Sequence, residues 1–131
     1  MTAGLSSTNL SHAWLNTLRG GGNGTNFTAP AAIYIQWHIG DPGSAGTANT
    51  AAVTTRSAVT MGAAASNAIA LSNSPTYTAT GSETLTHISV WSASSGGTFY
   101  WSCALASSKA VVNTDVVTQS TLGVSLAPIA A

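Results

Sequence analysis

The sequence LTHISVWSASSGGTFYWSCAL, residues 85–105, decides the fold of this chain. In its first seven residues, Ile88 and Val90 alternate with His87, Ser89 and Trp91, which is the two-residue period of a β-strand. Residues 92–97 are rich in Ser and Gly, as turns are, and residues 99–105 then alternate again. The stretch therefore predicts two antiparallel strands joined as a hairpin.

The same period recurs on both sides of this hairpin. Residues 33–39 place three isoleucines and a tryptophan on one face, and the turn formers of residues 40–43 end that strand. Shorter apolar stretches follow at Val59 and Met61, at Ile69 and Leu71, and at residues 111–112, 116–117 and 122–126. Short strands with a turn signal every ten or so residues predict an all-β, antiparallel β-sandwich or jelly-roll-like domain.

One helix is predicted near the start of the chain. Leu10, Ala13, Trp14 and Leu18 fall on one face at helical spacing, and the Gly-rich residues 20–24 end the helix. Residues 10–19 make fewer than three turns, so this helix has to dock on the body of the chain or on a neighbouring subunit. We therefore divide one structural unit into a helix with a Gly-rich arm, residues 1–29, and a β-sandwich domain, residues 30–131.

Charge is scarce throughout the chain. Only 5% of the 131 residues are charged, against about 25% in an ordinary domain. The six charged residues are Arg19, Asp41, Arg56, Glu83, Lys109 and Asp115. A neutral surface of Ser, Thr, Asn and Gly favours association between proteins and lacks the basic patch that nucleic acid needs. No signal peptide and no membrane-spanning stretch is recognisable, so we expect synthesis in a host cytoplasm and no membrane partner.

The residue types of catalytic and metal sites do not combine into a site. His12, His38 and His87 lack the short spacings of metal ligands, and the lone Cys103 has no partner cysteine. Asp41 stands in a Pro-Gly turn, where its carboxylate most naturally caps the local backbone. The sequence therefore predicts a protein that is not an enzyme and that uses no metal or other cofactor.

The aromatic and apolar residues are better explained by contacts with other proteins than by a catalytic or metal site. Along their strands, Tyr34, Trp91 and Tyr100 alternate with apolar residues that are expected to face the core. We therefore expect these three side chains to point outward. Tyr and Trp are enriched at interfaces, and exposed aromatics on a sheet also bind sugars. The candidate interface residues are Leu10, Trp14, Leu18, Tyr34, Trp91 and Tyr100. Sugar binding through Trp91 and Tyr100 is the weaker alternative.

Five segments carry a resemblance to a known group of proteins. Residues 33–43, 55–60, 86–91, 95–99 and 105–111 resemble, in that order, small virion proteins of tailed phages, especially phages of actinobacteria, identified as minor tail or tail-fibre-like proteins. The resemblance implies an all-β virion domain without catalytic residues. It also implies structural roles for the polar residues His38, Asp41, Arg56 and His87. The acidic residue that often precedes the arginine is missing here, so a carbonyl or another chain is the expected partner of Arg56.

The resemblance leaves two places in the virion. Because the chain has no repetitive shaft, we expect a minor capsid protein that decorates the capsid exterior and binds the major capsid protein and itself, with a trimer as one arrangement. The alternative is a minor tail or tail-fibre-associated protein that binds other tail proteins and a glycan at the host surface.

Overall fold

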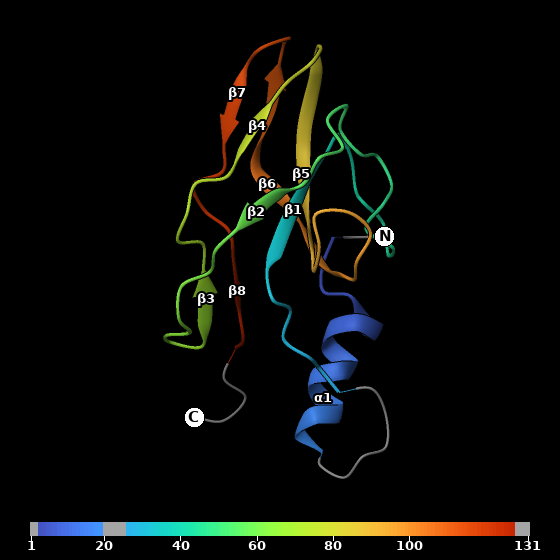
Figure 1. Cartoon of the computed structure of the whole chain (residues 1–131), viewed down its shortest axis with the longest axis vertical. Helices are drawn as coiled ribbons and strands as arrows, with labels where there is room; N and C mark the ends of the chain where they lie inside the picture. The colour runs from blue at the N-terminus through green and yellow to red at the C-terminus, as the bar shows by residue number, and fades with distance from the viewer. Residues whose placement is uncertain (1–2, 20–25, 128–131) are drawn as a thin grey trace.

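The computed structural model describes residues 3–19 and 26–127 of the chain and is mostly β (Figure 1). The Gly-rich stretch of the predicted arm lies outside the described residues. Two short helical segments come first, η1 (Ser7–Ser11) and α1 (His12–Leu18). The strands that follow are β1 (Ile33–His38), β2 (Ser57–Val59), β3 (Ala68–Ala70), β4 (Thr76–Thr78), β5 (Glu83–Trp91), β6 (Phe99–Val111), β7 (Val116–Thr118) and β8 (Gly123–Ser125). The predicted all-β fold with one N-terminal helix is confirmed.

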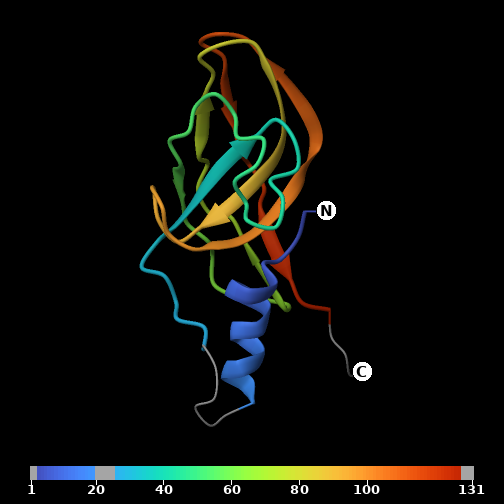
Figure 2. The same cartoon turned by 90° about the vertical axis from the view of Figure 1, so that its right-hand side faces the viewer.

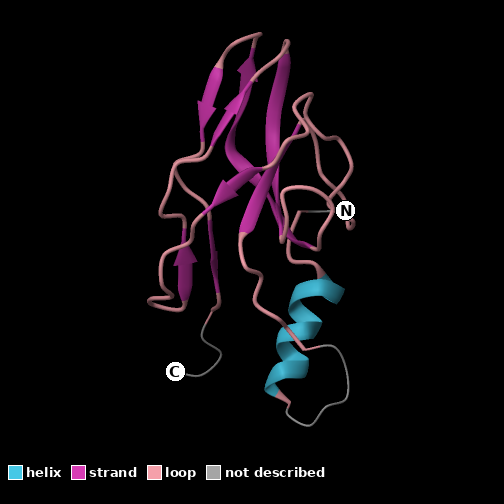
Figure 3. Cartoon of the chain, viewed as in Figure 1, coloured by secondary structure: helices cyan, strands magenta, loops and turns pink. Residues whose placement is uncertain are grey.

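The strands form one main sheet and two ribbons (Figure 3). The main sheet has the order β2-β1-β5-β6 and is antiparallel throughout. Strand β3 pairs with β8 and strand β4 pairs with β7, which makes two short ribbons. The apolar core joins Ile35, Trp37 and Val90 of the main sheet to Tyr77 of β4 and Leu122 before β8. The ribbons therefore act as the second layer of a sandwich.

The hairpin of β5 and β6 is the one that the sequence predicts, but β6 is longer than expected. The structure has a single strand of 13 residues where the sequence indicated separate strands at residues 99–105 and 111–112. The pairing with β5 shifts between Leu85 and His87, because Leu85 faces Lys109 whereas His87 faces Ala104. Residues 105–108 of β6 form this bulge. The bulge lets one strand run the whole length of the sheet while it bends.

The N-terminal segment docks on its own chain. Ser6 donates its N–H to the carbonyl of Tyr100 at 2.6 Å, and Ser102 donates its N–H to the carbonyl of Gly4 at 2.9 Å. Leu10 is only 1% exposed and belongs to the core cluster. Of the two docking partners that the sequence left open for Leu10, the structure therefore places it against its own sheet.

Beyond this anchor, α1 projects from one end of the strands (Figure 2). Trp14 packs edge to face on Phe27, and Phe27 packs in turn on Tyr100, each pair with ring centres 5.9 Å apart. The connection from β6 to β7 lies at the opposite end of the molecule (Figure 1). None of the helices within residues 3–19 and 26–127 is long and apolar enough to cross a membrane.

Candidate functional site

The second face of the main sheet brings most of the predicted residues together. The cross-strand pairs Tyr34 with Trp91 and His38 with His87 lie on this face. The expectation that Trp91 and Tyr100 point outward is wrong, because each is only 6% exposed. The chain itself covers them: Arg56 and Phe99 cover Trp91, and Phe27 packs on Tyr100. Tyr34 remains half-buried. Sheet parity could not reveal this second covering layer.

A chain of hydrogen bonds runs through the centre of this face. The indole N–H of Trp91 donates to Ser89 Oγ at 2.8 Å, and Ser89 Oγ lies 2.7 Å from His38 Nε2. On the other side of the ring, His38 Nδ1 lies 2.8 Å from the carbonyl oxygen of Ala48. Because a carbonyl only accepts, Nδ1 carries the proton and Nε2 accepts from the Ser89 hydroxyl. The neutral imidazole therefore satisfies every partner in the chain.

The environment of His38 favours that neutral form. The imidazole is fully buried, and burial lowers its pKa, with a further lowering from the neighbouring His87. The hydrogen bond to Ala48 raises the pKa but is outweighed. His87 has its own partner, since its Nδ1 lies 2.8 Å from Thr86 Oγ1. This arrangement holds residue 48 onto the sheet and leaves His38 without access to a substrate.

Arg56 fastens the turn between β5 and β6. Its guanidinium carbon lies 3.8 Å from the centre of the Trp91 ring. The same group donates to the carbonyl oxygens of Ala93 at 2.9 Å and Gly96 at 2.5 Å. Of the two expected kinds of partner, the structure therefore gives Arg56 carbonyls, and it adds a cation–π contact that the sequence did not indicate.

Asp41 shapes the loop that covers the sheet. Its Oδ1 accepts from the N–H of Gly43 at 2.8 Å, as the Pro-Gly turn predicted. Asn49 donates from Nδ2 to the Asp41 carbonyl at 2.8 Å and has a positive φ of 51°. Both contacts close the loop over residues 41–49, which brings Ala48 to His38.

Two acidic residues outside this face are also committed to the fold. Glu83 accepts from the hydroxyl of Tyr77 and, at 2.9 Å, from the N–H of Ala52, so it ties both layers together. Burial, with help from the Glu83 hydrogen bond, raises the pKa of Tyr77 to about 12. Asp115 Oδ2 accepts from the N–H of Val112 at 3.0 Å. Sequence reasoning missed Tyr77, because β4 is three residues long with one large apolar side chain.

The described residues contain no group of three His, Cys, Asp or Glu side chains placed to hold a metal ion. Exposed apolar residues gather elsewhere, toward the ends of the molecule. On α1, Leu18 is 82% exposed and Leu15 is 62% exposed, whereas Trp14 is half-buried. Val112 and Val116, at the connection from β6 to β7, are also exposed. The sequence analysis identified Leu18 but missed Leu15, Val112 and Val116. The sequence feature that could have identified them is an apolar residue beside a turn or on the polar side of a short helix.

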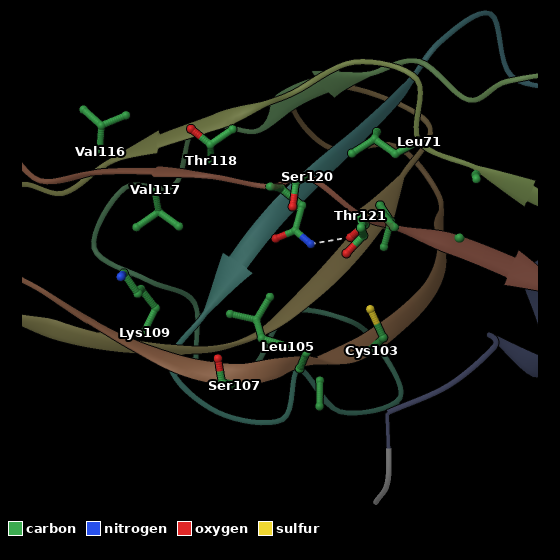
Figure 4. Close-up of a pocket in the computed structure, with 16 residues that line it drawn as sticks. Leu71, Cys103, Leu105, Ser107, Lys109, Val116, Val117, Thr118, Ser120 and Thr121 are labelled. Atoms are coloured by element: carbon green, nitrogen blue, oxygen red, sulfur yellow. Dashed lines mark hydrogen bonds between the residues drawn. The ribbon is translucent and has the colours of Figure 1, made fainter.

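A groove lies between β6 and the segment formed by residues 116–123 (Figure 4). Its volume is about 870 Å³. Leu105 and Cys103 rise from β6 on one side, and Val117 and Thr121 come from the opposite segment (Figure 4).

The chain matches, over residues 6–127, the protein family described as "Podophage GP4 fiber I protein gp80". The chain belongs to this family. No curated protein matches it. The match covers the helical segments and every strand, so the N-terminal helix is part of the family's domain.

Membership of the fiber I family makes the chain a phage virion structural protein of the tail-fibre type. Of the two expected places in the virion, the family favours the tail-fibre alternative over capsid decoration. The match is to a podophage family and gives no support to the resemblance to actinobacteriophage proteins in particular. In this fiber I family member, the central part of the second face is buried, with Gln36, His38, Ser89 and Trp91 each at most 6% exposed.

Proposed function

We propose that the chain is a non-enzymatic structural subunit of the phage tail-fibre apparatus, which acts by binding other tail proteins. Membership of the fiber I family over residues 6–127 carries this proposal. The use of the ionisable side chains supports it: His38, Arg56 and Glu83 all bind atoms of the chain itself.

The outer side of α1 is the attachment surface in this proposal. Leu10 fixes the preceding turn to the core, which leaves Leu15 and Leu18 on a supported but projecting helix. Apolar side chains held rigidly in this way bind a partner at a low cost in conformational entropy. The partner is a neighbouring protein of the tail.

Immunogold electron microscopy of intact phage particles tests the location. We expect an antibody raised against the purified chain to label the tail, and the same antibody pre-absorbed with that chain to give no label. Label spread over the head would contradict the proposal and restore capsid decoration. Absence of label, where the antibody binds dissociated particles, would point to a covered epitope, and the attachment test below then decides.

Attachment is tested by supplying variants to a phage that lacks the gene. We expect Leu18→Ser to lower the number of copies per purified particle at least tenfold. Val112→Ser changes an equally apolar exposed residue at the opposite end of the molecule, and it should keep the wild-type copy number. Equal incorporation of both variants would refute the role of α1.

A further inference from the structure

The connection from β6 to β7 contains a backbone conformation that its residue does not favour. Asp115 donates its N–H to the carbonyl of Val112 at 3.0 Å, which closes a four-residue turn over residues 112–115. Thr114, the third residue of this turn, has a φ of 76°. Glycine or asparagine normally occupies that position, because a β-branched side chain at positive φ is strained. The other non-glycine residues with positive φ in the described part of the chain, none of them β-branched, are Asn49, Ser66 and Asn67.

Hydrogen bonds hold the turn in this strained conformation. Thr114 donates its N–H to the carbonyl of Ala79 at 2.8 Å, and Ala79 donates its own N–H to the carbonyl of Asp115 at 2.8 Å. Asp115 Oδ2 accepts from the N–H of Val112 at 3.0 Å. None of these bonds uses the Thr114 hydroxyl, so they would form equally well with glycine. A left-handed conformation lowers the folded-to-unfolded ratio by a factor of about 5 to 30 for a residue other than glycine. The turn itself therefore gives no reason for a threonine at this position.

The turn displays apolar side chains to solvent. Val112 is 55% exposed, Val116 is 61% exposed, and Thr114 between them is also exposed. We call Val112, Thr114 and Val116 the tip. A rigid turn presents these side chains at a low cost in conformational entropy, which favours binding. Backbone strain that is kept at an exposed position is typical of functional sites.

The chemistry of the tip fits a protein better than a polysaccharide or a lipid headgroup. Residues 112–116 and the neighbouring turn of residues 78–82 contain no aromatic residue on which a sugar ring could stack. The same residues contain no lysine or arginine that would attract phosphate groups or anionic polymers. Asp115 is their one charged residue, and its carboxylate is bound to the Val112 N–H. Two valines and a threonine methyl group instead match an uncharged apolar depression on another protein.

We propose that the tip binds a protein on the surface of the host cell. The tip lies at the end of the molecule opposite to α1 (Figure 1). A chain that is attached to the tail through α1 directs its tip away from the particle, so the choice of a host protein rests on the proposed function. Where one particle carries several copies, weak single contacts combine into firm binding.

Adsorption of phage particles to host cells tests the tip. A phage that lacks the gene is supplied with each variant, and the copy number per purified particle and the adsorption rate are both measured. We expect Thr114→Gly and Val116→Ser to keep the wild-type copy number and to slow adsorption by about tenfold or more. Ser66→Gly also replaces an exposed residue with positive φ, in the turn before β3, and should adsorb at the wild-type rate. Wild-type adsorption by both tip variants at the wild-type copy number would overturn the proposal.

The stability of Thr114→Gly separates binding from a structural role. Relief of the strain offsets the additional entropy that glycine loses on folding, so we expect the urea midpoint of the purified variant to be no lower than that of the wild type. A variant that is no less stable and yet adsorbs more slowly has lost a contact and not its fold. A lower midpoint would mean that the threonine stabilises the turn, and would overturn the proposal.

Treatment of the host cells tests the class of partner. Digestion of the cell surface with protease should slow wild-type adsorption to the rate of Thr114→Gly, whereas oxidation of surface sugars with periodate should not. Slowing by periodate alone would overturn the proposal in favour of a glycan. A loss of both tip variants from the particles would identify a virion protein as the partner and would also overturn it.

The location of the chain is read separately from the tip. Immunogold label on the head together with slow adsorption of the tip variants would contradict the proposed tail location and leave the tip as a binding surface. Label on the tail together with unchanged adsorption would contradict the tip alone.

Discussion

At the scale of single residues, the polar side chains of this protein serve the backbone. His38 links Ser89 to the carbonyl of Ala48, and Arg56 links the carbonyls of Ala93 and Gly96 to the ring of Trp91. Such contacts satisfy buried groups that would otherwise cost about 1–3 kcal/mol each. The scarcity of charge in the sequence therefore goes together with a structural use of the charges that remain.

Protonation of His38 should destabilise the fold. Burial holds the folded pKa of His38 below its ordinary value of 6.5, so below that pH the unfolded chain binds a proton that the folded chain does not. The stabilisation is complete above pH 6.5 and is lost as the pH falls through the folded pKa, by at most about 1.4 kcal/mol per pH unit.

Urea denaturation at a series of pH values between about 7.5 and 5 measures this slope directly. His38→Asn should be less stable at neutral pH and should show a weaker fall. The exposed position of His12 offers a matched control, and His12→Asn should keep the wild-type slope. An identical slope in wild type and His38→Asn would contradict this account.

Two glycines in the loop of residues 41–49 allow the cost of backbone strain to be measured separately from the cost of steric overlap. Gly43 and Gly46 have φ values of +72° and +73°, so alanine at either site costs about 1–2 kcal/mol. A Cβ at Gly46 would also come within 2.7 Å of Cε2 of Phe99, whereas at Gly43 the nearest atom is 3.9 Å away. We expect Gly46→Ala to cost about 1–3 kcal/mol more than Gly43→Ala. Thermal unfolding of the pair measures this, and equal losses would refute the packing of the loop on Phe99.

At the scale of elements, the N-terminal helical segments are held by the packing of their inner side and not by their length. Leu10 is fully buried, while Leu18 on the next helical turns is mostly exposed. We expect Leu10→Ala to lower the free energy of unfolding by about 2–5 kcal/mol, and Leu18→Ala to change it by less than about 0.5 kcal/mol. Chemical denaturation followed by circular dichroism decides, and a large loss in Leu18→Ala would mean that the outer side of α1 is packed in the isolated chain.

The elements that the sequence predicts are those with a strong local signal. The two-residue period locates β1 and β5, and a glycine run marks the end of the region that holds α1. The sequence does not predict strand β4, because its only large apolar residue is a tyrosine flanked by Thr76 and Thr78. The sequence does not predict the full length of β6, because the bulge interrupts the two-residue period at residues 105–108. In both cases, pairing with a distant strand decides the structure.

The candidate site was predictable as a set of residues but not as a place. The resemblance to phage virion proteins implied structural roles for His38, Asp41, Arg56 and His87. The residues themselves predicted only that Asp41 caps its turn, which the structure shows. The burial of Trp91 and Tyr100 was not predictable, because it depends on Arg56, Phe99 and Phe27 folding back over the sheet. Alternation tells which side chains share a face, and it is silent on what covers that face.

At the scale of the whole molecule, stability rests on packing and on hydrogen bonds to the backbone. Asp41, Glu83 and Asp115 accept from main-chain N–H groups, so salt has little to screen. We expect the free energy of unfolding to change by less than about 0.5 kcal/mol between about 0.05 M and 0.5 M NaCl. Urea denaturation at both salt concentrations measures this, and a loss above about 1 kcal/mol would reveal an ionic contribution.

The centre of the main sheet is covered on both faces by the chain itself, and this has consequences for how the protein can change. Replacement of Trp37 or His38 would disturb two layers at once, so the centre of the domain has little freedom to vary. The rim is different, because Leu18 or Ala106 can be exchanged without repacking anything. Related phages can therefore change the binding partners of this domain by single substitutions at its margins while they keep the same core.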